Sequence, residues 1–83
     1  MSEAERREDE GGMIYDGKGL CWARHQLGWS HLKMARALRM NGSDEKLKSR
    51  LHEMEIGTRH VAGPVGVCVE AFLAGFRPEG FED

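Results

Sequence analysis

The hydrophobic positions of this chain recur every three or four residues in four separate stretches, which is the spacing of amphipathic helices. No stretch alternates apolar and polar residues as a half-buried strand does. The predicted helices cover about residues 17–27, 31–40, 44–55 and 63–74. We therefore expect an all-α domain of four or five short helices.

Each predicted helix has one stripe that would face the core, because residues three and four apart lie on the same side of a helix. Trp22 lies off the first stripe, so it either packs on residues 13–15 or stays exposed as an anchor for a partner. The four stripes are Leu20, Ala23, Arg24 and Leu27; Met34, Ala35 and Leu38; Leu47, Leu51 and Met54; and Val65, Cys68, Val69 and Phe72.

Capping residues bound these stripes. Short polar side chains that can accept hydrogen bonds from a first helical turn precede three of the helices, and Pro64 suits the start of the fourth. Glycines that tolerate a left-handed backbone follow three of the helices. The predicted N-caps are Asp16, Ser30 and either Ser43 or Asp44, and the predicted terminating glycines are Gly28, Gly57 and Gly75.

Charge divides the 83-residue chain into a mildly basic centre and two acidic ends, although the whole chain has a net charge of −2. Residues 1–12 lack large apolar side chains after Met1, and we expect them to form a disordered acidic arm. The arm either solubilises the protein, competes with DNA or contacts a protein partner. Residues 13–76 are the predicted domain, and residues 77–83 are expected to form a frayed C-terminal tail, with Phe81 available for docking.

Several functional classes lack support in the sequence. There is no membrane-spanning apolar run and no signal-peptide core, so we expect a cytoplasmic protein. Cys21 and Cys68 show no metal-binding spacing, and we expect two buried free thiols. The four histidines form no close ligand pair with a cysteine, and no phosphate loop or acid pair indicates an enzyme. No metal, cofactor or catalytic residue is predicted.

The predicted second and third helices, separated by Asn41-Gly42, have the outline of a helix-turn-helix. The segments Leu27-Gly28-Trp29-Ser30, Met34-Ala35 with Leu38, and Glu55-Ile56-Gly57-Thr58-Arg59 resemble the Cro/repressor-type (XRE) helix-turn-helix family over about residues 20–74. The family usually has a glycine where this chain has Arg39, and its turn is about six residues shorter. The resemblance implies a lambda-repressor-like fold and a sequence-specific regulator that binds double-stranded DNA as a homodimer.

The resemblance also implies roles for residues on the two motif helices. The third helix, at about residues 44–55, would enter the major groove, where polar side chains read base edges. Residues beside it and at the start of the second helix would contact the DNA backbone. The predicted base-reading residues are Lys48, Ser49, His52 and Glu45, and the predicted backbone contacts are Ser30, His31, Lys33, Lys46, Arg50 and Arg59.

Two questions stay open at this level. The last helix, with Phe72 and Phe76, is the expected dimer surface. The alternative function is a protein-interaction module, such as an antitoxin-like or adaptor domain, which Glu45, Glu53 and the acidic arm favour. Salt distinguishes the two, because binding through several phosphates weakens steeply as salt rises and a packed protein interface need not do so.

Overall fold

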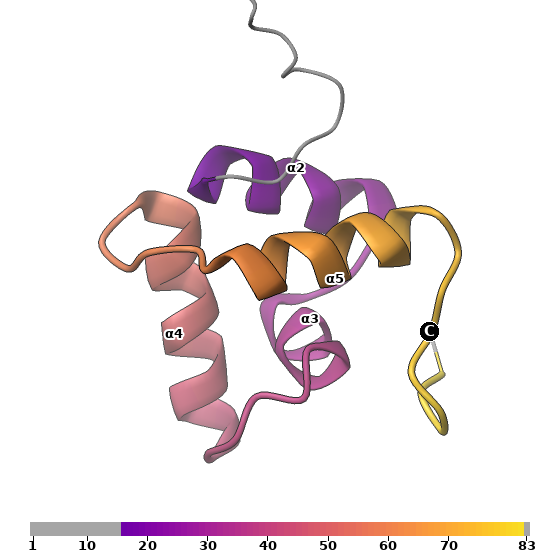
Figure 1. Ribbon diagram of the computed structural model, residues 1–83. Coiled ribbons are helices and arrows are strands. Elements are labelled where there is room, and N and C mark those ends of the chain that lie inside the picture. Colours follow the sequence, from indigo (N-terminus) through magenta and orange to yellow (C-terminus); the bar gives the residue numbers. More distant parts are fainter. Residues whose placement is uncertain (1–15, 83) are drawn as a thin grey trace, which may run out of the picture.

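A computed structural model describes residues 16–82 and shows four helices in this part of the chain, with no strand (Figure 1). The helices are α2 (Gly17–Leu27), α3 (His31–Ala37), α4 (Asp44–Ile56) and α5 (Gly63–Leu73). The predicted all-α fold is confirmed. The proposed acidic arm, residues 1–12, lies outside the described residues.

The four helices form two crossed layers. In Figure 1, α2 and α5 run alongside each other, while α4 descends from one end of them and α3 is seen almost end-on beside α4. Helix α4 packs against both α2 and α3, and α5 packs against α2. Helices α3 and α4, consecutive in sequence, therefore meet at a large angle and share one side of the molecule.

Apolar side chains from every helix and from the α2–α3 and α4–α5 connections fill the centre. The predicted third stripe is confirmed, because Leu47, Leu51 and Met54 are all buried. Val61, predicted to lie in a loop, is also buried and adds to the core from the α4–α5 connection. The buried core cluster is Leu20, Ala23, Trp29, Met34, Ala37, Leu51, Met54, Val61, Val69 and Phe72.

The predicted caps are largely confirmed. Oxygen atoms of the three N-cap side chains accept hydrogen bonds from the backbone amide three residues after each cap. These bonds join Gly19 N to Asp16 Oδ1 (3.0 Å), Lys33 N to Ser30 Oγ (3.1 Å) and Lys46 N to Ser43 Oγ (3.3 Å). Gly28 and Gly57 follow α2 and α4 with φ of 72° and 90°, in the left-handed conformation that glycine adopts without steric cost.

Helix α3 ends at Ala37, three residues before the predicted end. The reason lies at Arg39, whose φ of 59° is left-handed. Arg39 N donates to the Arg36 carbonyl (2.9 Å) and Met40 N to that of Ala35 (3.1 Å), which is the hydrogen-bond pattern of a Schellman cap. Arg39 therefore occupies a position at which glycine would carry no steric cost.

The predictions about the two cysteines and about the buried face of α5 need correction. Cys68 is exposed and Cys21 is only partly buried, so the prediction of two buried thiols is wrong. Gly66, not Cys68, lies in the buried face with Val69 and Phe72. A glycine carries no apolar side chain, so the spacing of hydrophobic residues did not indicate that this position faces inward.

Residues 77–82 pack against the domain, so the prediction of a frayed tail is wrong for them. The Phe81 ring lies 5.2 Å from the Trp29 ring, measured between centroids, and the Arg77 guanidinium lies 4.9 Å from the same ring. Arg39 Nη2 donates to the Glu79 carbonyl (2.6 Å). The apolar and cation–π contacts with Trp29 explain why this polar segment folds back.

Candidate nucleic-acid interface

The outer face of α4 carries a row of exposed polar side chains. Lys48, Ser49 and His52 are exposed, as the projection around the helix predicts, and Glu45 lies one turn before them. Lys48 Nζ lies 3.6 Å from Glu45 Oε2, so these two residues form an ion pair on the same face. Three of the four predicted base-reading residues therefore lie within one turn of each other, and Glu45 partly neutralises their charge.

A buried ion pair fixes the other end of α4. Arg24 on α2 donates from Nε to Glu55 Oε2 (2.6 Å) and from Nη2 to Glu55 Oε1 (3.1 Å). Its Nη1 donates to the carbonyl oxygen of Trp29 (3.0 Å), in the link between α2 and α3. Because Glu55 has only 5% of its side chain exposed, the pair sets the position of α4 relative to both neighbouring segments.

The titration of this pair follows from its surroundings. Burial alone would raise the pKa of Glu55. The hydrogen bonds and the positive charge of Arg24, with smaller contributions from His31 and Cys21, outweigh burial and lower this pKa. Burial, assisted by the negative charge of Glu55, raises the pKa of Cys21. At neutral pH the pair is ionised and the neighbouring thiol is neutral.

His31 connects the buried pair to the outer face. Its Nε2 lies 3.2 Å from Glu55 Oε1. The rings of His31 and His52 meet edge to face, with centroids 5.7 Å apart. A predicted backbone contact and a predicted base-reading residue are thus adjacent.

Ser30 and Lys33, also predicted to contact the DNA backbone, lie on the opposite edge of α3. They line an open groove of about 780 Å³ between α3, the following turn and residues 80–82. Arg36 and Arg39 contribute two further cations to this groove, and Leu32, Met40 and Phe81 contribute apolar surface. The sequence did not assign Arg36 or Arg39 to the site, although their charge and spacing along the helix were visible there.

Arg50 and Arg36 hold the α3–α4 turn. Arg50 Nη1 donates to the Asn41 carbonyl (2.8 Å). Arg36 Nη2 donates to both carboxylate oxygens of Asp44, at 3.0 and 3.1 Å. Arg50, predicted to contact the DNA backbone, therefore has a structural role in the turn.

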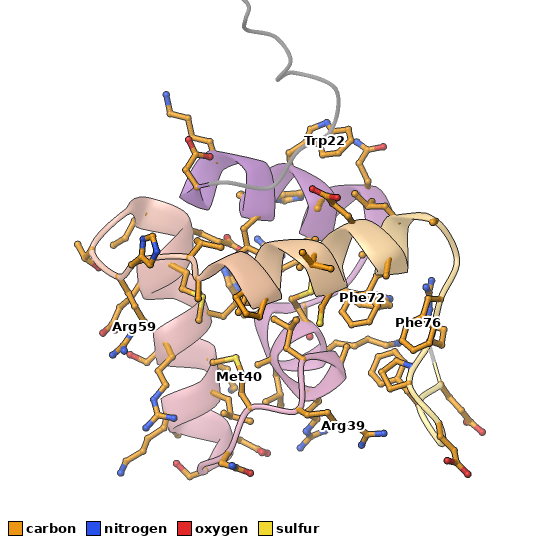
Figure 2. The ribbon with its side chains drawn as sticks, viewed as in Figure 1. Trp22, Arg39, Met40, Arg59, Phe72 and Phe76 are labelled. Atoms are coloured by element: carbon orange, nitrogen blue, oxygen red, sulfur yellow. The ribbon has the colours of Figure 1, made fainter. Side chains whose placement is uncertain are left out.

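The remaining predicted backbone contacts lie at the two ends of α4. Lys46 is exposed in the first turn. Arg59, in the loop after the helix, donates from Nε to Glu53 Oε1 (3.0 Å). Figure 2 shows Arg59 on the outer side of this loop. Arg59 is thus near α4 but already paired.

Of the two phenylalanines predicted for a dimer surface, only Phe76 is exposed. Phe72 is 2% exposed and packs against Trp29 with ring centroids 5.6 Å apart, so the prediction that it lies on a dimer surface is wrong. Phe76 is 58% exposed and stacks on the outer side of Phe72, with centroids 6.3 Å apart (Figure 2). Trp22 is 50% exposed and points away from the core, and the alternative in which it packs on residues 13–15 lies outside the described residues.

The described residues form neither a candidate metal site nor a membrane-spanning helix. Within residues 16–82, no cluster of three or more histidine, cysteine, aspartate or glutamate side chains has the geometry to hold a metal ion. In the same part of the chain, every helix is too short or too polar to cross a membrane.

The sequence did not identify the Arg24–Glu55 pair, although one signal was present. Arg24 was assigned to the inward stripe of its helix, and a buried guanidinium requires a partner. Glu55 follows buried Met54, so it borders the inward face of its own helix. Only the packing of α2 on α4 identifies the two as partners.

Comparison of the chain with protein-family models, with characterised proteins and with solved structures gave no match.

Proposed function

We propose that this protein is a sequence-specific DNA-binding regulator in which α3 and α4 act as a helix-turn-helix and α4 enters the major groove. The observation that carries this proposal is the row of Lys48, Ser49 and His52 on the outer face of α4. These side chains offer hydrogen-bond donors and acceptors of the kinds that read base edges. The protein would act in the cytoplasm.

The packing of α4 supports the proposal. A reading helix needs a fixed orientation, because a small rotation moves its side chains out of register with the base pairs. Leu47, Leu51 and Met54 bury one side of α4, and Glu55 ties its end to α2. The large angle between α3 and α4 in Figure 1 is also typical of helix-turn-helix proteins.

The cations around α3 extend the proposed contact surface. Lys33, Arg36 and Arg39 border the groove beside α3, where the DNA backbone would pass. Arg36 also neutralises Asp44 at the start of α4, which reduces repulsion between that carboxylate and phosphate. These contacts would supply affinity that does not depend on sequence.

We further propose that the regulator binds a palindromic site as a homodimer. One helix reads few base pairs, and two-fold pairing doubles the number that are read. Of the two phenylalanines assigned to the dimer surface from the sequence, Phe76 is the exposed one.

The experiment that tests the function is selection from a random pool of duplex DNA, followed by binding of the enriched duplex over a salt series. An enriched palindrome whose affinity falls steeply with salt is the expected result. Equal affinity for the enriched duplex and for a scrambled duplex of the same composition would contradict a sequence-specific role.

The charge of α4 favours a second candidate, the protein-interaction module. The helix carries three cationic and four acidic side chains, and Glu45, Asp44 and Glu53 lie on or near its outer surface. A carboxylate repels phosphate unless it is neutralised or accepts from cytosine. Binding of a protein partner that changes little with salt, together with no enrichment of DNA, would favour this candidate.

A further inference from the structure

Two histidines from different helices meet at the edge of the α4 outer face. His31 is the first residue of α3, and His52 belongs to the exposed row of α4. Their rings are nearly perpendicular, at 80°, with centroids 5.7 Å apart. His31 is held by Glu55, which Arg24 holds in turn. His31 therefore sits on a buried ion pair, and the exposed His52 ring contacts it from α4.

The acidic side chains of α4 already have cationic partners. If His31 and His52 both became protonated, two positive charges would be added beside this helix. Glu55 would share its single negative charge between Arg24 and His31, and the other α4 carboxylates are already paired. The α4 pairs are Asp44 with Arg36, Glu45 with Lys48, Glu53 with Arg59, and Glu55 with Arg24. An anion from outside the protein would supply the missing negative charge.

The titratable groups of α2 that face this cluster do not supply that charge. Burial raises the pKa of the Cys21 thiol, so it stays neutral near pH 7. A ring nitrogen of His25 lies 3.4 Å from Arg24 Nη2, so protonation of His25 would add positive charge to the cluster. Lys48 lies one helical turn before His52 and is paired with Glu45, so these two residues add no net charge. The groups around the pair therefore favour an anionic ligand.

We propose that His31 and His52 act as a pair that binds one DNA phosphate, and that protonation of the imidazoles strengthens this contact. The proposal rests on the proposed DNA-binding function and concerns the same surface. Imidazole is the side chain whose charge ordinarily changes between pH 5 and 8, and an imidazolium forms strong charge-assisted hydrogen bonds with phosphate. Glu55 engages one nitrogen of His31, which leaves the other for the phosphate.

This assignment changes the expected role of His52. A residue that reads bases discriminates between sequences, whereas a phosphate contact adds affinity for every sequence. Removal of His52 should therefore weaken binding to the selected duplex and to a scrambled duplex by the same factor. The loss should be larger at pH 6 than at pH 8.

The test compares four full-length proteins: the wild type, His31→Gln, His52→Gln and the double variant. Each binds the selected duplex at about pH 6 and pH 8 at constant ionic strength, and circular dichroism checks that each is folded. The wild type should bind about tenfold more tightly at pH 6 than at pH 8. Each single variant should lose most of this ratio, and the double variant should lose little more. His60→Gln, in the exposed α4–α5 loop, is the matched control and should keep the full ratio.

If both single variants kept the wild-type ratio of DNA affinity at pH 6 to affinity at pH 8, the proposal would be overturned. It would also be overturned if the reductions in this ratio added independently in the double variant. A second measurement needs no variant. Addition of duplex to wild-type protein near pH 7 should move the imidazole NMR signals of both His31 and His52 toward their protonated positions, and unmoved signals would also overturn it. Wild-type protein that binds no DNA at either pH would contradict the proposed function itself. DNA binding without proton linkage would contradict only the histidine pair.

Discussion

Arg24 and Glu55 form a two-point ion pair between α2 and α4, with Nε–Oε2 and Nη2–Oε1 distances of 2.6 and 3.1 Å. The same guanidinium donates to the Trp29 carbonyl, so one side chain joins three segments of the chain. The pair is largely buried. Loss of either partner would leave a buried charge without compensation, which is far more destabilising than loss of a surface pair.

Substitution Glu55→Gln should lower the free energy of unfolding by about 3 kcal/mol, because Arg24 would keep its charge and lose its counter-charge. Urea denaturation followed by circular dichroism measures this change. Glu53→Gln is the matched control, because Glu53 lies on the same helix and pairs with Arg59 in a far more exposed position. That substitution should cost less than about 1 kcal/mol. Equal effects of the two substitutions would contradict the structural role of the buried pair.

The same pair predicts an acid-dependent loss of stability. The pKa of Glu55 is lowered in the folded protein, so the unfolded chain binds a proton at this site more readily. Its contribution is complete above the ordinary glutamate pKa of about 4.3, and it declines as the pH falls from there through the lowered value. Unfolding free energy measured from pH 6 to pH 2.5 should fall less steeply for Glu55→Gln than for the wild type. Parallel curves would show that Glu55 titrates alike in both states.

Gly17 should not tolerate a side chain. A Cβ atom at this position would overlap the carbonyl oxygens of Met54 and Glu55, where α2 starts against the end of α4. Gly17→Ala should therefore destabilise the fold by about 1–3 kcal/mol. Gly63→Ala is the control, because Gly63 also starts a helix and a Cβ atom there meets nothing within 4 Å. If thermal unfolding gave the two variants the same midpoint, the close approach of α2 to α4 would be wrong.

Arg39 should show two opposed effects. Its left-handed backbone is costly for a residue with a side chain, but its guanidinium donates to Glu79. Arg39→Ala loses the hydrogen bond and keeps the backbone cost, whereas Arg39→Gly loses both. The glycine variant should be more stable than the alanine variant by about 1 kcal/mol. Chemical denaturation of the two variants tests this order, and the reverse order would exclude a left-handed residue at this position.

Phe81 should contribute to stability through Trp29. Phe81→Ala removes a ring that packs 5.2 Å from Trp29, and it should lower the free energy of unfolding by about 1–2 kcal/mol. In a Trp22→Phe background, tryptophan fluorescence should shift to longer wavelength as Trp29 meets water. Phe76→Ala, which removes a largely exposed ring, should change stability less. Unchanged fluorescence in the Phe81 variant would contradict the packing of residues 77–82.

Two neighbouring residues of α4 should affect DNA binding in different ways. Lys46→Ala should weaken binding to selected and scrambled duplexes by a similar factor and reduce the salt dependence, as expected for a phosphate contact. Ser49→Ala should chiefly reduce the preference for the selected duplex, by about 1 kcal/mol or more. Binding constants for both duplexes over a salt series make the comparison. Arg50 is a poor choice for this test because it also holds the Asn41 carbonyl.

The sequence predicted the features of this chain that depend on local spacing. Helix periodicity identified α4 and its buried face, and the capping residues at Asp16 and Ser30 marked where helices start. Arg39 shows where this reasoning ends. Nothing in the residue itself indicates the left-handed backbone that it adopts at the end of α3. The carbonyl that accepts from its guanidinium, that of Glu79, lies forty residues later.

The candidate site was predictable only in part for the same reason. The helix repeat places Ser49 and His52 on the side of α4 opposite its buried stripe, and both side chains are exposed as expected. The contact of His52 with His31 depends on how α3 crosses α4, which the local sequence does not determine. Phe72 is buried, as its place in the predicted inward stripe requires, and its separate assignment to a dimer surface is wrong. The ring that covers part of it, Trp29, belongs to a distant segment.

The cover over Trp29 also has a consequence for biosynthesis. Trp29 is synthesised before the residues that lie against its ring. These are Phe72, Arg77 and Phe81. Until they are synthesised, the nascent chain presents an uncovered indole that can associate with other chains or with a chaperone. A product that lacks residues 77–82 would retain Phe72 but would expose the part of Trp29 that Arg77 and Phe81 cover.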